Sequence, residues 1–258
     1  MSPVYTSVIL VGMGFTPSLI WLAYYLRKDP RPEPKYMILR VFFLGIVLAP
    51  LAVIAQWAFR EAALLFHSNF QASSSVAFFL WAAFIEEAVK FLPVKFAVLH
   101  NPEFDEPVDG MIYMIAAALG FAAIENILVL FQTIPSGTEL ALQTWALRFV
   151  GATLLHAVSS AMVGYFLALS WFYHRHSGKL IFAGIAIASV FHFLFNFTLL
   201  KGDGPEGFFY STILLIVVAV IISFLFAKIK RRASLTESRR ASGTTIKESG
   251  LSTETALP

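Results

Sequence analysis

Seven apolar runs constrain this chain more than any other feature of its sequence. About 20 predominantly apolar residues are enough to cross the hydrocarbon core of a bilayer. Only helices and closed barrels satisfy the backbone in lipid, and these runs lack the alternation of barrel strands. The sequence therefore predicts an all-α, polytopic transmembrane helical bundle with about seven spans. The runs are 4–26, 36–58, 74–99, 108–133, 144–173, 180–200 and 207–228.

The composition excludes several classes of protein. Of the 258 residues, 58% are hydrophobic and 14% are charged, which argues against a soluble domain. The chain has no cysteine, so disulfides, thiolate metal sites and cysteine nucleophiles are excluded together. No motif or folded basic face supports a nucleic-acid partner. The first run lacks a basic leader and is long enough to be a span rather than a cleaved signal peptide.

Lysines and arginines predict the orientation, because they gather on the cytoplasmic side of membrane proteins. With seven spans, the basic clusters that follow the first, fifth and seventh runs fall on one side. We therefore expect a multi-pass protein of the plasma membrane with its N-terminus outside and its C-terminus in the cytoplasm. Residues 59–72 form a half-amphipathic piece that we expect to lie along the outer interface. The clusters are Arg27, Lys28, Arg31, Lys35 and Arg40; Arg175 and Lys179; and Lys228, Lys230, Arg231 and Arg232.

The C-terminal residues differ in composition from the rest of the chain. Residues 1–232 form the predicted transmembrane domain, with a core at about 74–200. Residues 233–258 are rich in Ser, Thr, Glu and Arg, and we expect a disordered cytoplasmic tail. Arg-Arg-Ala-Ser occurs at 231–234 and 239–242, where a solvated anchor at an anionic leaflet is favoured over a phosphorylated electrostatic switch.

Ionisable residues interrupt four of the apolar runs near their centres. Each charge at the bilayer centre costs roughly 2.5 to 3.5 kcal/mol, so such residues usually face an internal cavity. Lys90 follows Glu86 by four residues and Glu87 by three, so it reaches back to either acid on a helix. Four runs with polar groups at similar depth predict one shared cavity. These groups are Glu86, Glu87 and Lys90; Glu125 and Asn126; His156; and His192 and Asn196.

Carboxylates and imidazoles in such a cavity suit three kinds of chemistry. They act as general acids and bases and stabilise an oxyanion, they bind catalytic zinc, or they form proton or cation relays. There is no His-Glu-x-x-His helix, and Asp105, Asp109 and Asp203 do not form a pair embedded in the membrane. Ser159 and Ser160 lie too close to His156 along one helix to make a nucleophile–base pair.

These motifs in this order resemble the PrsW family of intramembrane proteases. That family is related to the type II CAAX prenyl endopeptidases and to bacteriocin-immunity-like proteins, so the resemblance implies a CAAX-protease-like core. It covers about residues 80 to 200. It implies an intramembrane endopeptidase that cuts a membrane-associated protein, in the namesake case an anti-sigma factor. The motifs are Glu86-Glu87-Ala-Val-Lys90, Asp105 with Asp109-Gly110, Phe121-Ala-Ala-Ile-Glu125-Asn126, His156, and His192-Phe-Leu-Phe-Asn196.

The resemblance also implies roles for the residues. Glu86 would activate the water, supported by Glu87 and Lys90. His192 and Asn196 would polarise the scissile carbonyl, and His156 would orient the site or bind metal. The remaining members of the expected site are Glu125, which stands where the CAAX branch has a histidine, with Asn126 and Asp109 in support.

Two mechanisms stay open at this point. The preferred one needs no cofactor and uses Glu86 as the base. In the other, Glu125, His156 and His192 hold zinc, and Glu86 accepts a proton from its water. The alternative function is a non-proteolytic membrane protein, either a transporter-like relay or a scaffold that retains the cavity. Asp105 and Asp109 suit ordinary helix capping or, in the functional reading, substrate gating at the mouth of a span.

Overall fold

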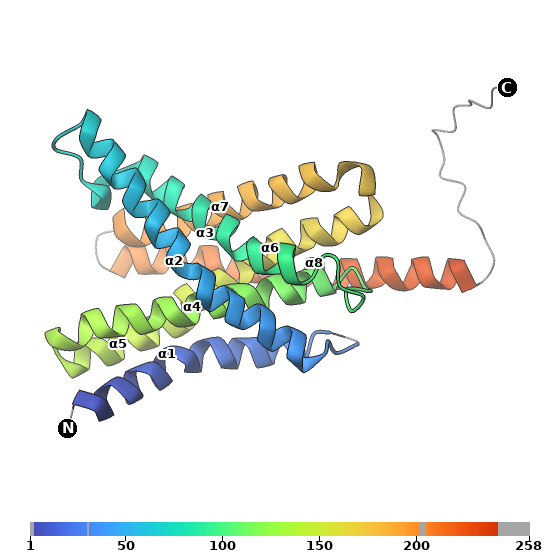
Figure 1. Ribbon diagram of the computed structural model, residues 1–258, viewed down its shortest axis with the longest axis horizontal. Helices are drawn as coiled ribbons and strands as arrows, with labels where there is room; N and C mark the ends of the chain where they lie inside the picture. Colours follow the sequence, from blue (N-terminus) through green and yellow to red (C-terminus); the bar gives the residue numbers. More distant parts are fainter. Residues whose placement is uncertain (1–2, 30, 202–204, 242–258) are drawn as a thin grey trace.

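The computed structural model describes residues 3–29, 31–201 and 205–241, and it is a helical bundle with no strand among these residues (Figure 1). Three short 3-10 turns, η1 (Ala72–Ser74), η2 (Ile134–Ser136) and η3 (His174–His176), lie in connections between the helices. The helices are α1 (Pro3–Leu26), α2 (Lys35–Phe66), α3 (Val76–Ala97), α4 (Asp109–Thr133), α5 (Thr138–Val150), α6 (Ala152–Phe172), α7 (Ser177–Lys201) and α8 (Pro205–Ala241).

Six stretches are long and apolar enough to cross a membrane, and they fall on α1, α2, α4, the α5–α6 pair, α7 and α8. Helix α3 carries Glu86, Glu87 and Lys90 within its apolar run. Its 22 residues nevertheless give about 33 Å of helix, enough for a hydrocarbon core of about 30 Å. This confirms the predicted all-α polytopic bundle of about seven spans.

Helix α4 is the centre of the bundle and packs most extensively against α6, α2 and α1. Nearly every side chain from Asp109 to Ala123 is buried. Small residues allow the close approach, because a Cβ on Gly120 would lie 2.0 Å from the carbonyl oxygen of Phe42 on α2. A Cβ on Gly164 of α6 would lie 2.6 Å from the carbonyl oxygen of Gly110. Both glycines therefore allow close packing of the helices.

Three boundaries differ from the sequence-based expectation. Residues 59–66 continue α2 rather than starting a separate interfacial piece, since the run Arg-Glu-Ala-Ala-Leu-Leu at 60–65 consists of good helix formers. The expected span 144–173 is split at Gly151 into α5 and α6. Helix α8 continues to Ala241, so the tail is helical over 233–241, because extending an existing helix needs no new nucleus. Residues 242–258 of the expected disordered tail lie outside the described residues, as does Asp203.

The connections sort the charges to the two ends of the bundle. The connections α1–α2, α3–α4 and α6–α7 lie at the right-hand end in Figure 1, as does the end of α8. Arg232 of α8 is held there by Phe172 and Tyr173, with its guanidinium 4.1 Å from the centre of the Phe172 ring. The three basic clusters of the sequence therefore gather at one end of the molecule.

Candidate active site

Helix α3 brings a buried ion pair into the bundle. The side chains of Glu87 and Lys90 are fully buried, and Lys90 Nζ lies 2.8 Å from Glu87 Oε1. Lys90 Nζ is also 3.7 Å from Glu86 Oε2 and 4.9 Å from the centre of the Phe121 ring. The single ammonium therefore faces both carboxylates, as the three- and four-residue spacings predicted.

Glu87 is the acceptor for donors from three helices. Ser159 Oγ and Ser160 Oγ of α6 donate to its two oxygens at 2.9 and 3.0 Å. Both serines thus serve to hold a carboxylate, in agreement with the argument against a serine nucleophile. His192 of α7 contacts Glu87 Oε1 through Nδ1 at 2.8 Å. Because an ionised carboxylate only accepts, Nδ1 carries the proton and leaves the Nε2 lone pair free.

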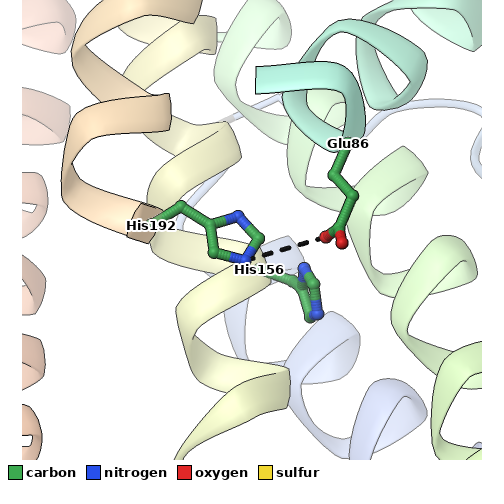
Figure 2. A group of neighbouring side chains, drawn as sticks. All are labelled: Glu86, His156 and His192. Carbon is green, nitrogen blue, oxygen red and sulfur yellow. Dashed lines mark ion pairs between the residues drawn. The ribbon is translucent and has the colours of Figure 1, made fainter. Parts of the chain in front are cut away.

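His192 directs that second nitrogen at Glu86. His192 Nε2 lies 3.7 Å from Glu86 Oε2, as Figure 2 shows. The other oxygen of Glu86 accepts a hydrogen bond of 3.0 Å from Gln56 Nε2 on α2. Gln56 therefore fixes the rotation of the carboxylate and leaves Oε2 toward the histidines.

His156 is arranged in the same way by a different glutamate. Its Nε2 lies 2.7 Å from Glu125 Oε2, and its Nδ1 is buried without a hydrogen-bond partner among the described residues. The rings of His156 and His192 are 5.3 Å apart and nearly perpendicular. Each imidazole therefore contacts a carboxylate at hydrogen-bonding distance through one nitrogen, and the second nitrogen of His192 faces Glu86.

Glu86, His156 and His192 form a group that could hold a metal ion. Each offers one ligand atom, and these atoms lie within 4.8 Å of one another (Figure 2). Glu86 Oε2, like His156 Nδ1, is buried and accepts no hydrogen bond from the described residues. Two imidazoles and a carboxylate are a donor set of catalytic zinc sites, in which a fourth position stays open for water.

Glu125 contacts this group through His156 and is held in place by Arg148 of α5. Its Oε2 lies 3.2 Å from Arg148 Nη2, and Arg148 Nε donates to Asn126 Oδ1 at 2.7 Å. Asn126 Nδ2 in turn donates to Thr153 Oγ1 at 3.0 Å. The buried Asn126 therefore holds Arg148 in place, and Arg148 in turn holds Glu125.

Asn196 and Asp109 are the remaining expected site residues. Asn196 is half-buried on α7, one turn after His192. Asp109 begins α4, 16 residues before Glu125, which corresponds to about 24 Å of helix. It lies instead beside Asp29 and Glu33 at the end of the bundle. Asp109 therefore takes no part in the group around Glu86.

Two residues of the site, Gln56 and Arg148, were not predicted from the sequence. A glutamine within an apolar run was a usable signal, since it must find a partner in lipid. Arg148 is not among the site residues expected from the sequence. Arg148 lies just before the helix break at Gly151, and its side chain contacts α4. The sequence did not reveal this contact.

A pocket of about 360 Å³ opens beside Glu86 between α2, α3 and α4. Val53, Ile54 and Leu128 on its rim are each about half exposed on the apolar outer surface of the bundle. The pocket therefore connects the polar group to the side of the bundle rather than to one of its ends. Its lining is Ala49, Pro50, Ala52, Val53, Ile54, Gln56, Glu86, Phe121, Ile124, Glu125 and Leu128.

Comparison with known proteins shows where this arrangement belongs. The family described as "PrsW family intramembrane metalloprotease" matches residues 33–224. The chain belongs to the PrsW family. This confirms the resemblance carried by the ordered motifs and makes the protein a multi-pass intramembrane protease, and so a hydrolase.

Several relatives named Protease PrsW cover most of the chain. The one from Geobacillus kaustophilus is 31% identical over 195 residues, which are 75% of this chain and 81% of the relative. The one from Oceanobacillus iheyensis is 32% identical over 193 residues, 75% of this chain and 83% of the relative. The PrsW of Bacillus subtilis is 31% identical over 195 residues, 74% and 82% respectively. No solved structure matches the chain.

Proposed function

We propose that this PrsW protein hydrolyses a peptide bond of a membrane-associated protein at the group of Glu86, His156 and His192. The observation that supports it is the pair of buried atoms without hydrogen bonds, Glu86 Oε2 and His156 Nδ1. Leaving a buried polar atom unpaired costs about 1–3 kcal/mol, and such atoms call for an explanation. A reacting water or a metal ion between the three side chains would satisfy both atoms.

A metal ion fits the residues present, and zinc is the metal we propose. Glu86, His156 and His192 would be its ligands, with Glu86 in the place that sequence reasoning gave to Glu125. This also departs from the metal-free mechanism preferred from the sequence. Each imidazole already has its other nitrogen on a carboxylate, the usual outer arrangement of metal-binding histidines. When bound, zinc lowers the pKa of its water toward about 7.

The side chains around this group have separate roles in the proposed reaction. Glu87 fixes the ring and tautomer of His192, and Lys90 compensates the charge of Glu87. Glu87 is therefore a positioning residue. With Glu86 as a ligand, Glu125 is the remaining carboxylate in the pocket, and we assign to it the proton lost by the attacking water. Asn196 keeps its proposed role of polarising the scissile carbonyl, but without His192, because Glu87 and zinc would engage both nitrogens of that ring.

The pocket suits an apolar polypeptide that arrives from the lipid. Its walls are aliphatic or aromatic except for Gln56, Glu86 and Glu125. A membrane-spanning substrate could unwind one segment into this space and present a peptide bond to Glu86. By resemblance the substrate is an anti-sigma factor. The gathering of basic residues at one end supports a plasma-membrane protein with the C-terminus in the cytoplasm.

Metal content of the purified protein tests the ligand assignment. We expect zinc near one equivalent in the wild type and its loss in His156→Ala and His192→Ala, with the matched control His100→Ala, an exposed histidine, unchanged. Chelation should abolish cleavage, and added zinc should restore it. Full activity after exhaustive chelation would instead support the metal-free mechanism, in which Glu86 is the base.

Comparison of membrane fragments tests the protease reaction itself. Cells with the wild type should contain a fragment of a membrane protein that is missing with Glu86→Gln, while both proteins insert and purify alike. An unchanged fragment pattern together with ion-coupled flux in proteoliposomes would favour the relay function instead.

A further inference from the structure

A second group of carboxylates lies at the end of the bundle, at the opposite end of α4 from Glu125. Asp29 and Glu33 come from the α1–α2 connection, and Asp109 is the first residue of α4. Each offers one carboxylate oxygen, and these oxygens lie within 4.8 Å of one another. The group joins two parts of the chain that are 80 residues apart, and it shares no residue with the site around Glu86.

Two carboxylate oxygens of this group are buried and accept no hydrogen bond from the described donor groups. Asp109 is 0% exposed and Asp29 is 8% exposed. Asp109 Oδ2 accepts from the backbone N–H groups of Asp105 and Glu106 at 3.1 and 2.7 Å, and Asp29 Oδ1 accepts from that of Arg31 at 3.0 Å. Asp109 Oδ1 and Asp29 Oδ2 accept no hydrogen bond from a donor group among the described residues, and the carboxyl group of Glu33 lies within hydrogen-bonding reach of Asp109. The backbone thus holds both carboxylates in place while one oxygen of each stays available.

The nearby cations Arg31 and Lys230 have partners outside this group. Arg31 Nη1 lies 2.7 Å from Glu106 Oε1, and Lys230 Nζ donates to the carbonyl oxygen of Lys28. Tyr113 O–H donates to Glu33 Oε2. Burial raises the pKa of both Asp29 and Glu33, and at Asp29 it outweighs the opposing effect of the Lys230 ammonium.

We propose that Asp29, Glu33 and Asp109 bind a divalent cation of the hard, oxygen-preferring class, Mg²⁺ or Ca²⁺. Such ions take carboxylate oxygens and complete their shell with water. The all-oxygen donor set separates this site from the histidine-rich group proposed to bind zinc. The ion would tie the α1–α2 connection to the first turn of α4, the central helix.

Terbium luminescence of the full-length protein in detergent tests the site. Tb³⁺ substitutes for hard cations, and Tyr113 beside Glu33 is placed to sensitise its emission. We expect saturable emission in the wild type that Ca²⁺ or Mg²⁺ displaces. Asp109→Asn should weaken Tb³⁺ binding at least tenfold, because the amide keeps the backbone contacts but removes a charged ligand. Glu103→Gln, an exposed carboxylate before α4, and Glu86→Gln should bind as the wild type does.

Thermal unfolding gives a second measurement that does not depend on light emission. The Tm of the wild type should rise with saturating Ca²⁺ or Mg²⁺ over its value in chelator. Asp109→Asn should unfold at a higher Tm than the wild type in chelator, since one repelling charge is gone, and should gain nothing from the cation. If Asp109→Asn does not fold, Asp29→Asn carries the same expectations. Absence of saturable emission in the wild type, or emission unchanged by these substitutions, would overturn the proposal and indicate a shared proton instead.

Discussion

Buried charge in this protein is stabilised by contacts between helices. Glu87 receives donors from α3, α6 and α7, and Lys90 is enclosed by two carboxylates and an aromatic ring. Removing one member of a buried pair leaves an uncompensated charge, which costs about 3–5 kcal/mol. The contacts that hold the fold together at this depth are therefore the same ones that orient His192.

Glu87→Gln separates these two roles of Glu87. The amide leaves Lys90 without its closest counter-charge, so we expect a loss of about 3–5 kcal/mol in unfolding free energy. It also weakens the hold on His192 Nδ1, which should lower zinc affinity and activity about 10–100-fold. Denaturation and zinc titration of the purified variant measure the two effects.

The double variant Glu87→Gln/Lys90→Met is the control for that prediction. It removes both charges, so stability should recover substantially, whereas zinc affinity should stay low because His192 is still loosely held. Recovery of zinc affinity along with stability would mean that Glu87 has a structural role alone.

At the scale of elements, α4 owes its central place to small side chains. Its sequence from Ala116 to Ala123 has no residue larger than alanine except Leu119 and Phe121, and the neighbouring helices approach its backbone there. In lipid, tight packing of small residues replaces the hydrophobic driving force between helices. Hydropathy alone could not single out α4, since lipid-facing and buried helices are equally apolar.

Gly120→Ala should destabilise the bundle measurably. The added Cβ would lie 2.0 Å from the carbonyl oxygen of Phe42, so α2 and α4 must separate. Overpacking of this kind costs about 1–3 kcal/mol. Thermal unfolding in detergent measures the cost, and Gly12→Ala is the matched control because a Cβ there meets nothing within 4 Å. Equal Tm values for the two variants would contradict the close contact of α2 with α4.

The rim of the pocket gives a prediction about substrate access. Val53→Trp should obstruct the space between α2 and α4 and raise the KM for a membrane-spanning substrate, while zinc content stays unchanged. Val53 is 55% exposed, so the fold should tolerate the larger side chain. Val47→Trp, also on α2 and 67% exposed but outside the pocket, should leave cleavage unchanged. Equal cleavage by both variants would show that the substrate enters elsewhere.

For the whole molecule, the sequence predicted more of the helices than of the contacts between them. The apolar runs marked the helices, and the spacing of Glu86, Glu87 and Lys90 predicted their ion pairs. Spacing could not reveal that His192 binds Glu87 rather than Asn196, or that Arg148 reaches Glu125 from another helix. Those contacts depend on the rotation of α4, α6 and α7 about their axes, which short-range sequence patterns do not determine.

The predicted orientation is testable because the chain contains no cysteine. Ser68 lies in the α2–α3 connection and His174 in the α6–α7 connection, and both are exposed at opposite ends of the bundle (Figure 1). Basic residues gather at the end that carries His174, so the positive-inside bias places that end in the cytoplasm. A membrane-impermeant maleimide should therefore label Ser68→Cys on intact cells and His174→Cys after lysis alone. The reverse pattern would invert the orientation, whereas labelling of both on intact cells would contradict the passage of α3, α4 and α6 across the membrane between them.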